Sequence, residues 1–121
     1  MRDLVKAFKA LSDETRLRIL NLLLERECCV CEVMQALRIS QTRASRNLRA
    51  LYDAGFLKVR RDGLWMLYSI NEEMDETRRR ILEAVRRSLE GDETAALDRE
   101  RLKKAERIGP SAAQKRLEGE A

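Results

Sequence analysis

The chain has 121 residues, a length that suits one domain, or one domain with a tail, and its formal net charge is +4. No uninterrupted apolar stretch approaches the roughly 18 residues of a membrane span, and the first residues lack the apolar core of a secretory signal. We therefore expect a cytoplasmic protein. Histidine is absent, and neither a glycine-rich phosphate loop nor a nucleophile–base pair is recognisable, so we do not expect an enzyme.

The first part of the sequence predicts three helices. Apolar residues recur at helical spacing over residues 3–11, which indicates a short amphipathic helix. Ser12 can cap a second helix over about residues 13–25, which is apolar on most sides and should be central. A third short helix is expected from about Val30 to Leu37.

A more polar helix and a β-hairpin follow. Ser40 is a good cap for a helix from Gln41 to Ala54, which Gly55 ends. Two β-rich runs, residues 56–60 and 64–70, are joined by residues 61–63, where Asp-Gly is a strong hairpin signal.

The last part of the chain begins with one more helix and then becomes highly charged. That helix opens at Asn71 or Asp75 and ends near Gly91. Beyond it, residues 92–121 carry few large apolar side chains. We expect a partly helical extension over residues 95–108 and disorder after Gly109-Pro110, so residues 1–91 are the predicted domain and residues 92–121 a C-terminal extension.

This order of elements is typical of a winged helix-turn-helix, a mainly α fold with one small hairpin. A short helix, a turn and a capped helix with polar outward positions are the helix-turn-helix, and the hairpin is the wing. Residues 38–65 carry seven basic side chains against two acidic ones, a local net charge of +5. Each arginine alone is better explained as part of a solvated helix face, but the combination favours DNA binding. The predicted contacts to bases and phosphates are Ser40, Gln41, Thr42, Arg43, Ser45, Arg46, Arg49, Arg60 and Arg61.

Three cysteines, Cys28, Cys29 and Cys31, lie within four positions at the entrance to the third predicted helix. A helix N-terminus stabilises a thiolate, so we expect these thiols to be more acidic than free cysteine. Three soft ligands without nitrogen suit trivalent arsenic or antimony better than tetrahedral zinc. Two other interpretations are that the thiols simply pack the core, or that Cys28 and Cys31, in C-x-x-C spacing, are a redox pair.

The spacing of the cysteines also predicts a switch. In a regular helix, residues i and i+2 point to nearly opposite sides, so Cys29 and Cys31 should converge on one atom only if the first turn unwinds. The polar helix follows after a short turn, so ligand capture should disturb it and oppose DNA binding.

Several segments together resemble the ArsR family of bacterial metalloregulatory repressors. They are the run from Leu11 to Leu20, the Cys29-Val-Cys31 run, the run from Ile39 to Leu51 and the Ala54-Gly-Phe-Leu run. The resemblance covers residues 3 to about 90, and Thr42 stands where the family often has proline.

This resemblance implies a homodimer built on the first and last helices of the domain, bound to an imperfect palindrome near a promoter. Candidates for that interface from the pattern are Leu4, Phe8, Leu82, Val85 and Leu89, although Leu4 and Phe8 equally suit an ordinary core. The Cys-Val-Cys run looks like the arsenic site of the family. Many members have a third cysteine where this chain has Met34, which leaves Cys28 as the substitute third ligand.

The sequence therefore predicts a homodimeric repressor that binds operator DNA and is released by As(III) or Sb(III), with no permanently bound cofactor. The alternatives are a repressor that responds to thiol oxidation or persulfide and, from another class, a thiol protein or enzyme that does not bind DNA.

Overall fold

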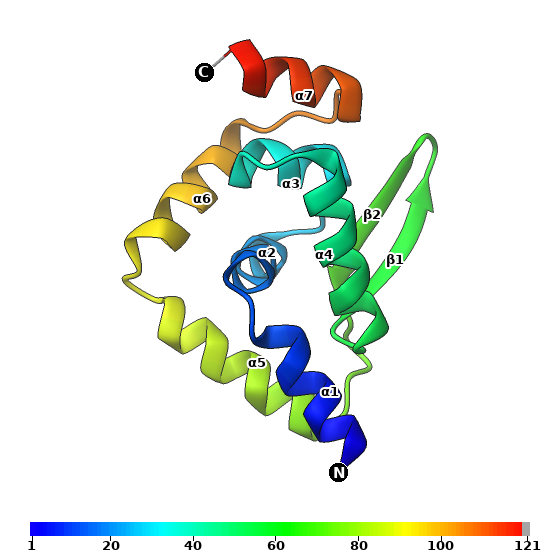
Figure 1. Ribbon diagram of the computed structural model, residues 1–121, viewed down its shortest axis with the longest axis vertical. Helices are drawn as coiled ribbons and strands as arrows, with labels where there is room; N and C mark the ends of the chain where they lie inside the picture. The colour runs from blue at the N-terminus through cyan, green and yellow to red at the C-terminus, as the bar shows by residue number, and fades with distance from the viewer. Residues whose placement is uncertain (120–121) are drawn as a thin grey trace.

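The computed structural model describes residues 1–119 of the chain. Its elements, in order, are α1 (Arg2–Leu11), α2 (Glu14–Glu25), α3 (Val30–Leu37), α4 (Gln41–Asp53), β1 (Leu57–Asp62), β2 (Trp65–Ile70), α5 (Glu76–Leu89), α6 (Glu93–Lys104) and α7 (Pro110–Gly119). Figure 1 shows α2 end-on at the centre, with the other helices around it and the hairpin standing out at one side. This arrangement confirms the predicted winged helix-turn-helix.

Side-chain caps fix where several helices begin. Asp13 accepts a hydrogen bond from the Arg16 amide at 3.0 Å, so it caps α2 in place of the predicted Ser12, whose hydroxyl donates to the Phe8 carbonyl. Ser40 caps α4 as predicted. Asp75 rather than Asn71 caps α5. Short polar side chains satisfy amide groups that a helix start leaves without intrahelical partners.

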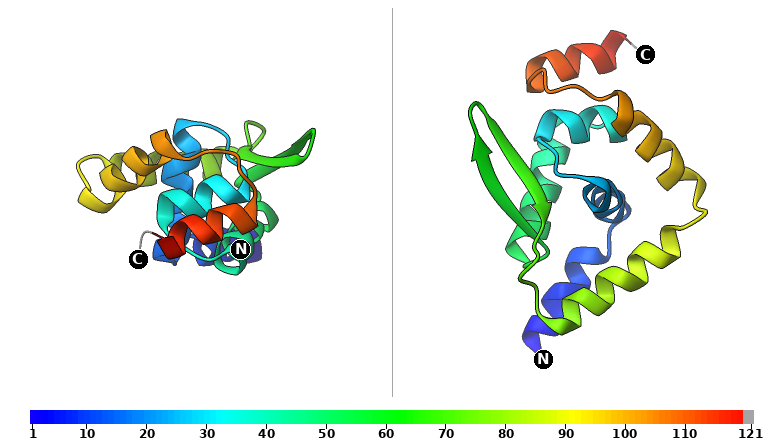
Figure 2. Two further views of the ribbon diagram at one scale, coloured as in Figure 1. Left: turned by 90° about the horizontal axis from the view of Figure 1, so that it is seen from above. Right: turned by 180° about the vertical axis from the view of Figure 1, so that it is seen from behind.

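The hairpin is antiparallel, and its register pairs Leu57 with Ile70 and Asp62 with Trp65. The turn is therefore Gly63-Leu64 and not the predicted connection of residues 61–63, because Arg61 and Asp62 still pair within the hairpin. Gly63 has a φ of +61°, a conformation that glycine adopts without strain. Seen from above, the hairpin extends away from the helical body (Figure 2).

The core surrounds α2, where Ile19, Leu20 and Leu22 are fully buried. This confirms the predicted central place of that helix. At one edge, Arg78 of α5 donates to the Ala54 carbonyl at 2.7 Å and pairs with Asp3 of α1 at 2.9 Å. The arginine thus holds α1 and α5 next to the end of α4.

The C-terminal residues are more ordered than the sequence predicts. The expected disorder after Gly109-Pro110 is wrong for residues 110–119, which form α7 and lie over α3 in both side views (Figures 1 and 2). The helix needs little apolar surface because its small Ala113 reaches the core and is fully buried. The predicted helical part of the extension is confirmed as α6, which packs against α2 and α3.

Buried polar contacts add to the apolar packing of Leu102 where α6 joins the body. Arg18 of α2 makes two hydrogen bonds to the carboxylate of Asp98, at 2.8 and 2.9 Å, and Asp98 is completely buried. Asn21 donates to the Ala95 carbonyl at 3.1 Å. Within the part of the chain that the structure describes, no helix is long and apolar enough to cross a membrane.

Candidate nucleic-acid interface and thiol site

The helix-turn-helix consists of α3 and α4 joined by Arg38, Ile39 and Ser40. Arg38 adopts a left-handed conformation with a φ of +58°, which reverses the chain, and Ile39 is buried beneath the turn. Helix α4 buries Ala44, Leu48 and Leu51. The opposite side of the helix therefore faces outward, as the apolar stripe predicts.

Most predicted DNA-contacting residues of α4 lie on this outer side. Gln41, Thr42 and Arg46 are exposed, and Ser45 is partly exposed. Arg43 donates to the Thr15 hydroxyl at 3.1 Å, and Arg49 pairs with Asp53 at 3.1 Å within the same helix. The first turn of α4 therefore presents amide, hydroxyl and guanidinium groups, which can hydrogen-bond to base edges or phosphates.

The wing contributes Arg60 and Arg61, both exposed. The guanidinium of Arg60 makes two hydrogen bonds to the carboxylate of Glu27, and this pairing holds the pKa of Glu27 below its ordinary value. Glu27 directly precedes the cysteines. The wing is thus tied to the segment that carries the thiols, a link that the sequence pattern did not reveal.

Cys29 and Cys31 are joined by a disulfide bond, with their Cα atoms 5.4 Å apart. Cys29 is the residue before α3 and has extended backbone, with φ −84° and ψ 167°, whereas Cys31 lies in the first turn. The prediction that the two sulfurs meet only if the first turn unwinds is therefore wrong. The predicted start of the helix was correct, but the change of backbone at Cys29 redirects its side chain toward Cys31.

Cys28 belongs to a different environment. Its amide and carbonyl both hydrogen-bond to Tyr68 of β2, at 2.9 and 2.8 Å, and its side chain is fully buried. Consecutive residues of extended chain point to opposite sides, so the Cys28 thiol faces away from that of Cys29. Burial raises the pKa of Cys28 to about 12, so the expected acidity is wrong for this thiol.

The structure does not bring the three cysteines together as predicted. Among residues 1–119, no three side chains of the histidine, cysteine, aspartate or glutamate type form a group able to hold a metal ion. The C-x-x-C redox pairing of Cys28 with Cys31 is likewise wrong, because the bonded pair is Cys29 with Cys31 and Cys28 is a free thiol.

A buried carboxylate supports the thiol pair from behind. Glu32, only 3% exposed, accepts from the Cys29 amide at 3.0 Å and pairs with Arg26 at 2.6 Å and Arg107 at 3.1 Å. The sequence alone assigned no role to Glu32. Its position three residues after Cys29 is the spacing of a capping box, a signal that could have identified it.

The C-terminal extension also contacts the thiol helix. Gln35 of α3 donates to the Glu106 carbonyl at 2.8 Å and accepts from the Glu106 amide at 3.1 Å. The Glu106 carbonyl lies 4.0 Å from the sulfur of Cys31. Residues far along the chain, which no local pattern could place, thus lie beside the cysteines.

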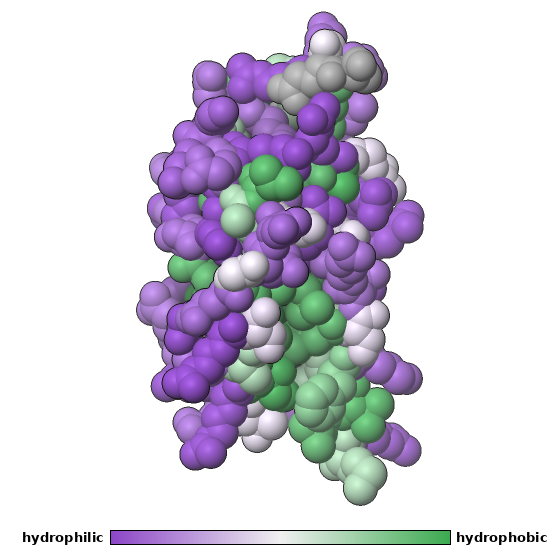
Figure 3. Space-filling model, turned by 90° about the vertical axis from the view of Figure 1, so that its left-hand side faces the viewer, coloured by the Kyte–Doolittle hydropathy of each residue, from purple (hydrophilic) through white to green (hydrophobic). Residues whose placement is uncertain are grey.

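The candidates for a self-interface divide into two groups. Leu4 and Phe8 of α1 are 43% and 52% exposed, and Val85 and Leu89 of α5 are half-buried. Leu82 is only 6% exposed and packs inside the protomer core, so its predicted place in the interface is wrong. Figure 3 views the molecule from the left-hand side of Figure 1. Apolar residues gather over the lower part of this face, where α1 and α5 lie.

Comparison with known proteins finds similar bacterial regulatory proteins. Residues 13–59 match the model of the bacterial regulatory protein, arsR family. The chain is 44% identical over 72 residues to a cadmium resistance transcriptional regulatory protein homolog of Staphylococcus aureus, covering 59% of this chain and 60% of that one. It is 44% identical over 70 residues to an arsenic resistance transcriptional regulator of Pseudomonas putida, covering 57% and 55%. The chain thus spans less than two thirds of these two relatives.

Longer matches extend the similarity. A probable mercury resistance operon repressor of Streptomyces lividans is 38% identical over 91 residues, which cover 75% of this chain and 70% of that one. Among solved structures, a homodimeric winged helix-turn-helix DNA-binding domain from Mycobacterium bovis is 30% identical, with a TM-score of 0.63, covering 76% of this chain and 82% of that one. HlyU from Vibrio cholerae is 28% identical, also with a TM-score of 0.63, covering 72% and 91%.

Proposed function

Since this chain belongs to the ArsR family of bacterial regulatory proteins, we propose that it is a transcriptional repressor that binds operator DNA as a homodimer and dissociates when As(III) or Sb(III) binds its cysteines. One observation carries the proposal: a converged pair of cysteines lies at the start of the first helix of a helix-turn-helix whose second helix exposes polar side chains.

In this function, the first turn of α4 reads base edges in the major groove. Gln41 can make two hydrogen bonds to adenine and Arg46 two to guanine, while Thr42, Arg43 and Ser45 serve bases or phosphates. Ser40, Arg49, Arg60 and Arg61 contact the backbone. Arg60 reaches a phosphate only by leaving Glu27, so DNA binding and the conformation before the cysteines are linked.

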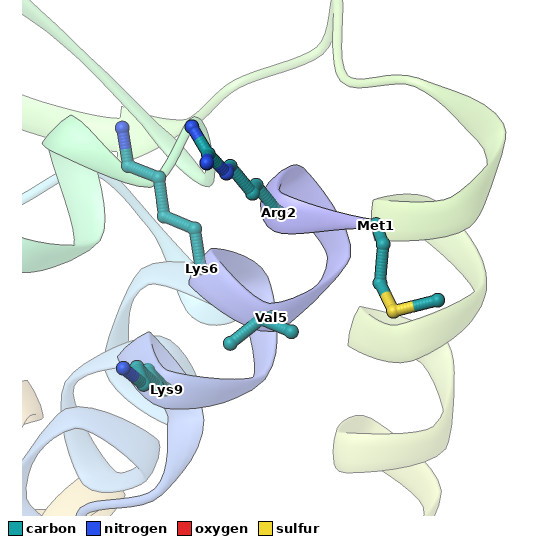
Figure 4. Close-up of a pocket in the computed structure, with 5 residues that line it drawn as sticks. All are labelled: Met1, Arg2, Val5, Lys6 and Lys9. Atoms are coloured by element: carbon teal, nitrogen blue, oxygen red, sulfur yellow. The ribbon is translucent and has the colours of Figure 1, made fainter.

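The homodimer forms through α1 and α5. Exposed Leu4 and Phe8, with Val85 and Leu89, provide the apolar part of the interface. A shallow hollow of about 590 Å³ lies along α1 (Figure 4). Five residues from successive turns at the start of the chain line it: Met1, Arg2, Val5, Lys6 and Lys9. All five come from one helix and its preceding residue, which suits a surface covered by a second protomer better than an enclosed site for a small ligand.

The inducer binds to Cys29 and Cys31 once the disulfide is reduced. Soft thiolates prefer soft centres, and the names of similar proteins refer to arsenic, cadmium and mercury resistance. Cys28 can become a third ligand only if it gives up both backbone hydrogen bonds to Tyr68. Cys29 and Cys31 are therefore the proposed primary ligands.

The test is a fluorescence anisotropy titration with DNA from upstream of the gene, under a phosphine reductant. Specific binding should weaken steeply with salt, since phosphate contacts release counterions, and arsenite or antimonite should release the DNA. Cys29→Ser and Cys31→Ser should bind DNA but resist arsenite, whereas Cys28→Ala should still respond. DNA binding that arsenite leaves unchanged in the wild-type protein would refute the proposed inducer.

The disulfide itself favours a second candidate, a repressor that senses oxidation. Peroxide would accept two electrons from the two thiols, giving the Cys29–Cys31 disulfide and two water molecules. Two treatments distinguish the candidates. An oxidation sensor releases DNA with peroxide and keeps it when arsenite is added under the phosphine. An arsenite sensor keeps DNA with peroxide and releases it when arsenite is added under the phosphine.

A further inference from the structure

Both cysteines of the Cys29–Cys31 pair lie beneath the surface of the protein. Cys29 is 3% exposed and Cys31 is 1% exposed. A hollow of about 200 Å³ adjoins the pair, and Pro110, the first residue of α7, forms part of its wall. A reagent that attacks either sulfur must therefore pass the segments that cover it.

The connection between α6 and α7 covers Cys31. This connection, residues 105–109, is outside any helix or strand and runs above α3 from α6 to the start of α7 (Figure 1). The carbonyl oxygen of Glu106 lies 4.0 Å from the Cys31 sulfur. We use the name C-terminal strap for residues 105–119, which are the connection together with α7.

Gln35 of α3 fastens the strap from beneath. Its side chain is buried, and its amide nitrogen donates to the carbonyls of Cys31 and Glu106, both at 2.8 Å. Its amide oxygen accepts from the Glu106 backbone at 3.1 Å and from the Arg116 guanidinium at 3.0 Å. All four hydrogen-bonding positions of the side chain are used, and three of them bind the strap.

Glu32 provides a second fastening. Its buried carboxylate accepts from the Cys29 amide at 3.0 Å and pairs with Arg107 of the strap at 3.1 Å. The same side chain thus holds the start of α3 and the strap. The position of the strap is tied directly to the backbone of the thiol pair.

The strap has little apolar anchorage compared with these polar contacts. Ala113 is fully buried against α3, whereas Ile108 and Leu117 are only partly buried. The polar groups of the strap and of α3 can hydrogen-bond to water once they separate. Segments with few buried apolar contacts open locally at a lower free energy than the core unfolds. The strap can therefore open while α2, α3 and α4 stay folded.

We infer that the C-terminal strap is a cover over the thiol pair, and that it must open before any reagent or ligand reaches Cys29 and Cys31. An atom held between the two sulfurs needs more room than a disulfide bond, so it competes with the closed strap. The apparent affinity of the pair is then its intrinsic affinity multiplied by the fraction of molecules in which the strap is open. This inference goes beyond the proposed function and does not depend on the identity of the inducer.

The experiment measures how fast iodoacetamide reacts with each thiol of the full-length protein, after phosphine reduction and removal of the phosphine. The thiolate sulfur displaces iodide, so one S–C bond forms as the C–I bond breaks. Mass spectrometry with peptide fragmentation gives the rate at each cysteine. Cys28, which is held by Tyr68 of the hairpin, is the reference thiol within the same molecule. When opening and closing are fast compared with alkylation, the rate follows the open population.

Gly109→Ala tests the strap without removing any contact. Gly109 has a φ of +87°, and an added Cβ would meet no atom within 4 Å, so the substitution introduces backbone strain alone. This strain disfavours the closed strap, and we expect alkylation of Cys29 and Cys31 about tenfold faster than in the wild type. Gly91→Ala is the matched control, because Gly91 has a φ of +79°, equally open surroundings and a place between α5 and α6. It should leave the rates unchanged.

Two side-chain variants loosen the fastenings directly. Arg107→Ala and Arg116→Ala each remove one ion contact of the strap, at side chains 34% and 37% exposed, so the core stays intact. Each should accelerate alkylation of the pair about threefold, a modest effect because water already screens these charges. Lys115→Ala, at an exposed position of α7, is their control.

Faster alkylation of Cys29 and Cys31 with an unchanged rate at Cys28 would support the strap. Equal rates in the wild type and in all variants would overturn the inference, and so would equal acceleration at all three cysteines, which indicates general loosening. In the DNA titration, Gly109→Ala should respond to about tenfold less arsenite. Arsenite that releases DNA from neither protein would refute the proposed function, while the alkylation rates still decide whether the strap is a cover.

Discussion

We predict that replacing Arg18 and replacing Asp98 destabilise the protein by different amounts. The difference follows from how deeply each partner of this ion pair is buried. Asp98 is completely buried, and after Arg18→Ala its remaining cation is Arg101, with an N–O distance of 3.7 Å. Removing one partner of a buried ion pair costs about 3–5 kcal/mol, and Arg101 places this case at about 3 kcal/mol. Asp98→Ala instead leaves Arg18, 22% exposed and able to turn to water, so we expect a loss of about 1–2 kcal/mol.

The assay is urea unfolding of the reduced, full-length protein at one protomer concentration, because the proposed dimerisation would make stability depend on concentration. The double variant Arg18→Ala, Asp98→Ala should lose less than the sum of the single losses, since neither charge is left unpaired. Equal losses for the two single variants, or simple additivity, would refute the assignment of Asp98 as a buried charge that depends on Arg18.

Three further predictions concern the DNA-binding elements. Ser40→Ala should lower stability by about 1 kcal/mol, since it removes the cap that accepts from the Arg43 amide, and thermal unfolding measures this. Arg46→Ala should weaken specific DNA binding by about 1–3 kcal/mol if the exposed side chain reads a base, and unchanged affinity would exclude it from the interface. Glu27→Gln should strengthen DNA binding, because Arg60 no longer exchanges a carboxylate for a phosphate, and weaker binding would contradict this competition. Because the pKa of Glu27 is lowered by Arg60, the pair stabilises the fold above the ordinary pKa of Glu27 and loses that effect as pH falls through the lowered value, so the acid stability of wild type and Glu27→Gln should converge.

Local patterns were enough to predict the elements of the winged helix. The apolar stripe of Ala44, Leu48 and Leu51, the cap at Ser40 and the Asp-Gly hairpin signal each depend on residues close in sequence. The structure has α4 where these signals place it and has the predicted hairpin, with its turn displaced to Gly63-Leu64. The central α2 was likewise evident from its continuous apolar character.

Features that depend on contacts distant in sequence could not be predicted. The C-terminal extension was expected to be disordered at its end because it has few large apolar residues, yet Ala113 packs into the core and Asp98 pairs with Arg18, 80 residues away. The separation of Cys28 from Cys29 depends on Tyr68, which holds the backbone before α3 in extended form. The sequence showed three adjacent thiols, and only the bridge to the wing determines which two converge.

The strength of the proposed switch can be compared with the contacts available to it. Moving a two-state equilibrium from 1:99 to 99:1 requires a differential affinity of about 10⁴, or about 5.5 kcal/mol. A homodimer divides this between two equivalent sites, so each site must supply about 100-fold, or about 2.7 kcal/mol. One side-chain contact with a base is worth about 1–3 kcal/mol. Gln41 lines the same small hollow, about 200 Å³ in volume, as Cys29 and Cys31. Loss of the Gln41 contact in each half-site is therefore of the size required, and Gln41→Ala should both weaken DNA binding and reduce the effect of the inducer, because the ligand would then have no such contact to remove.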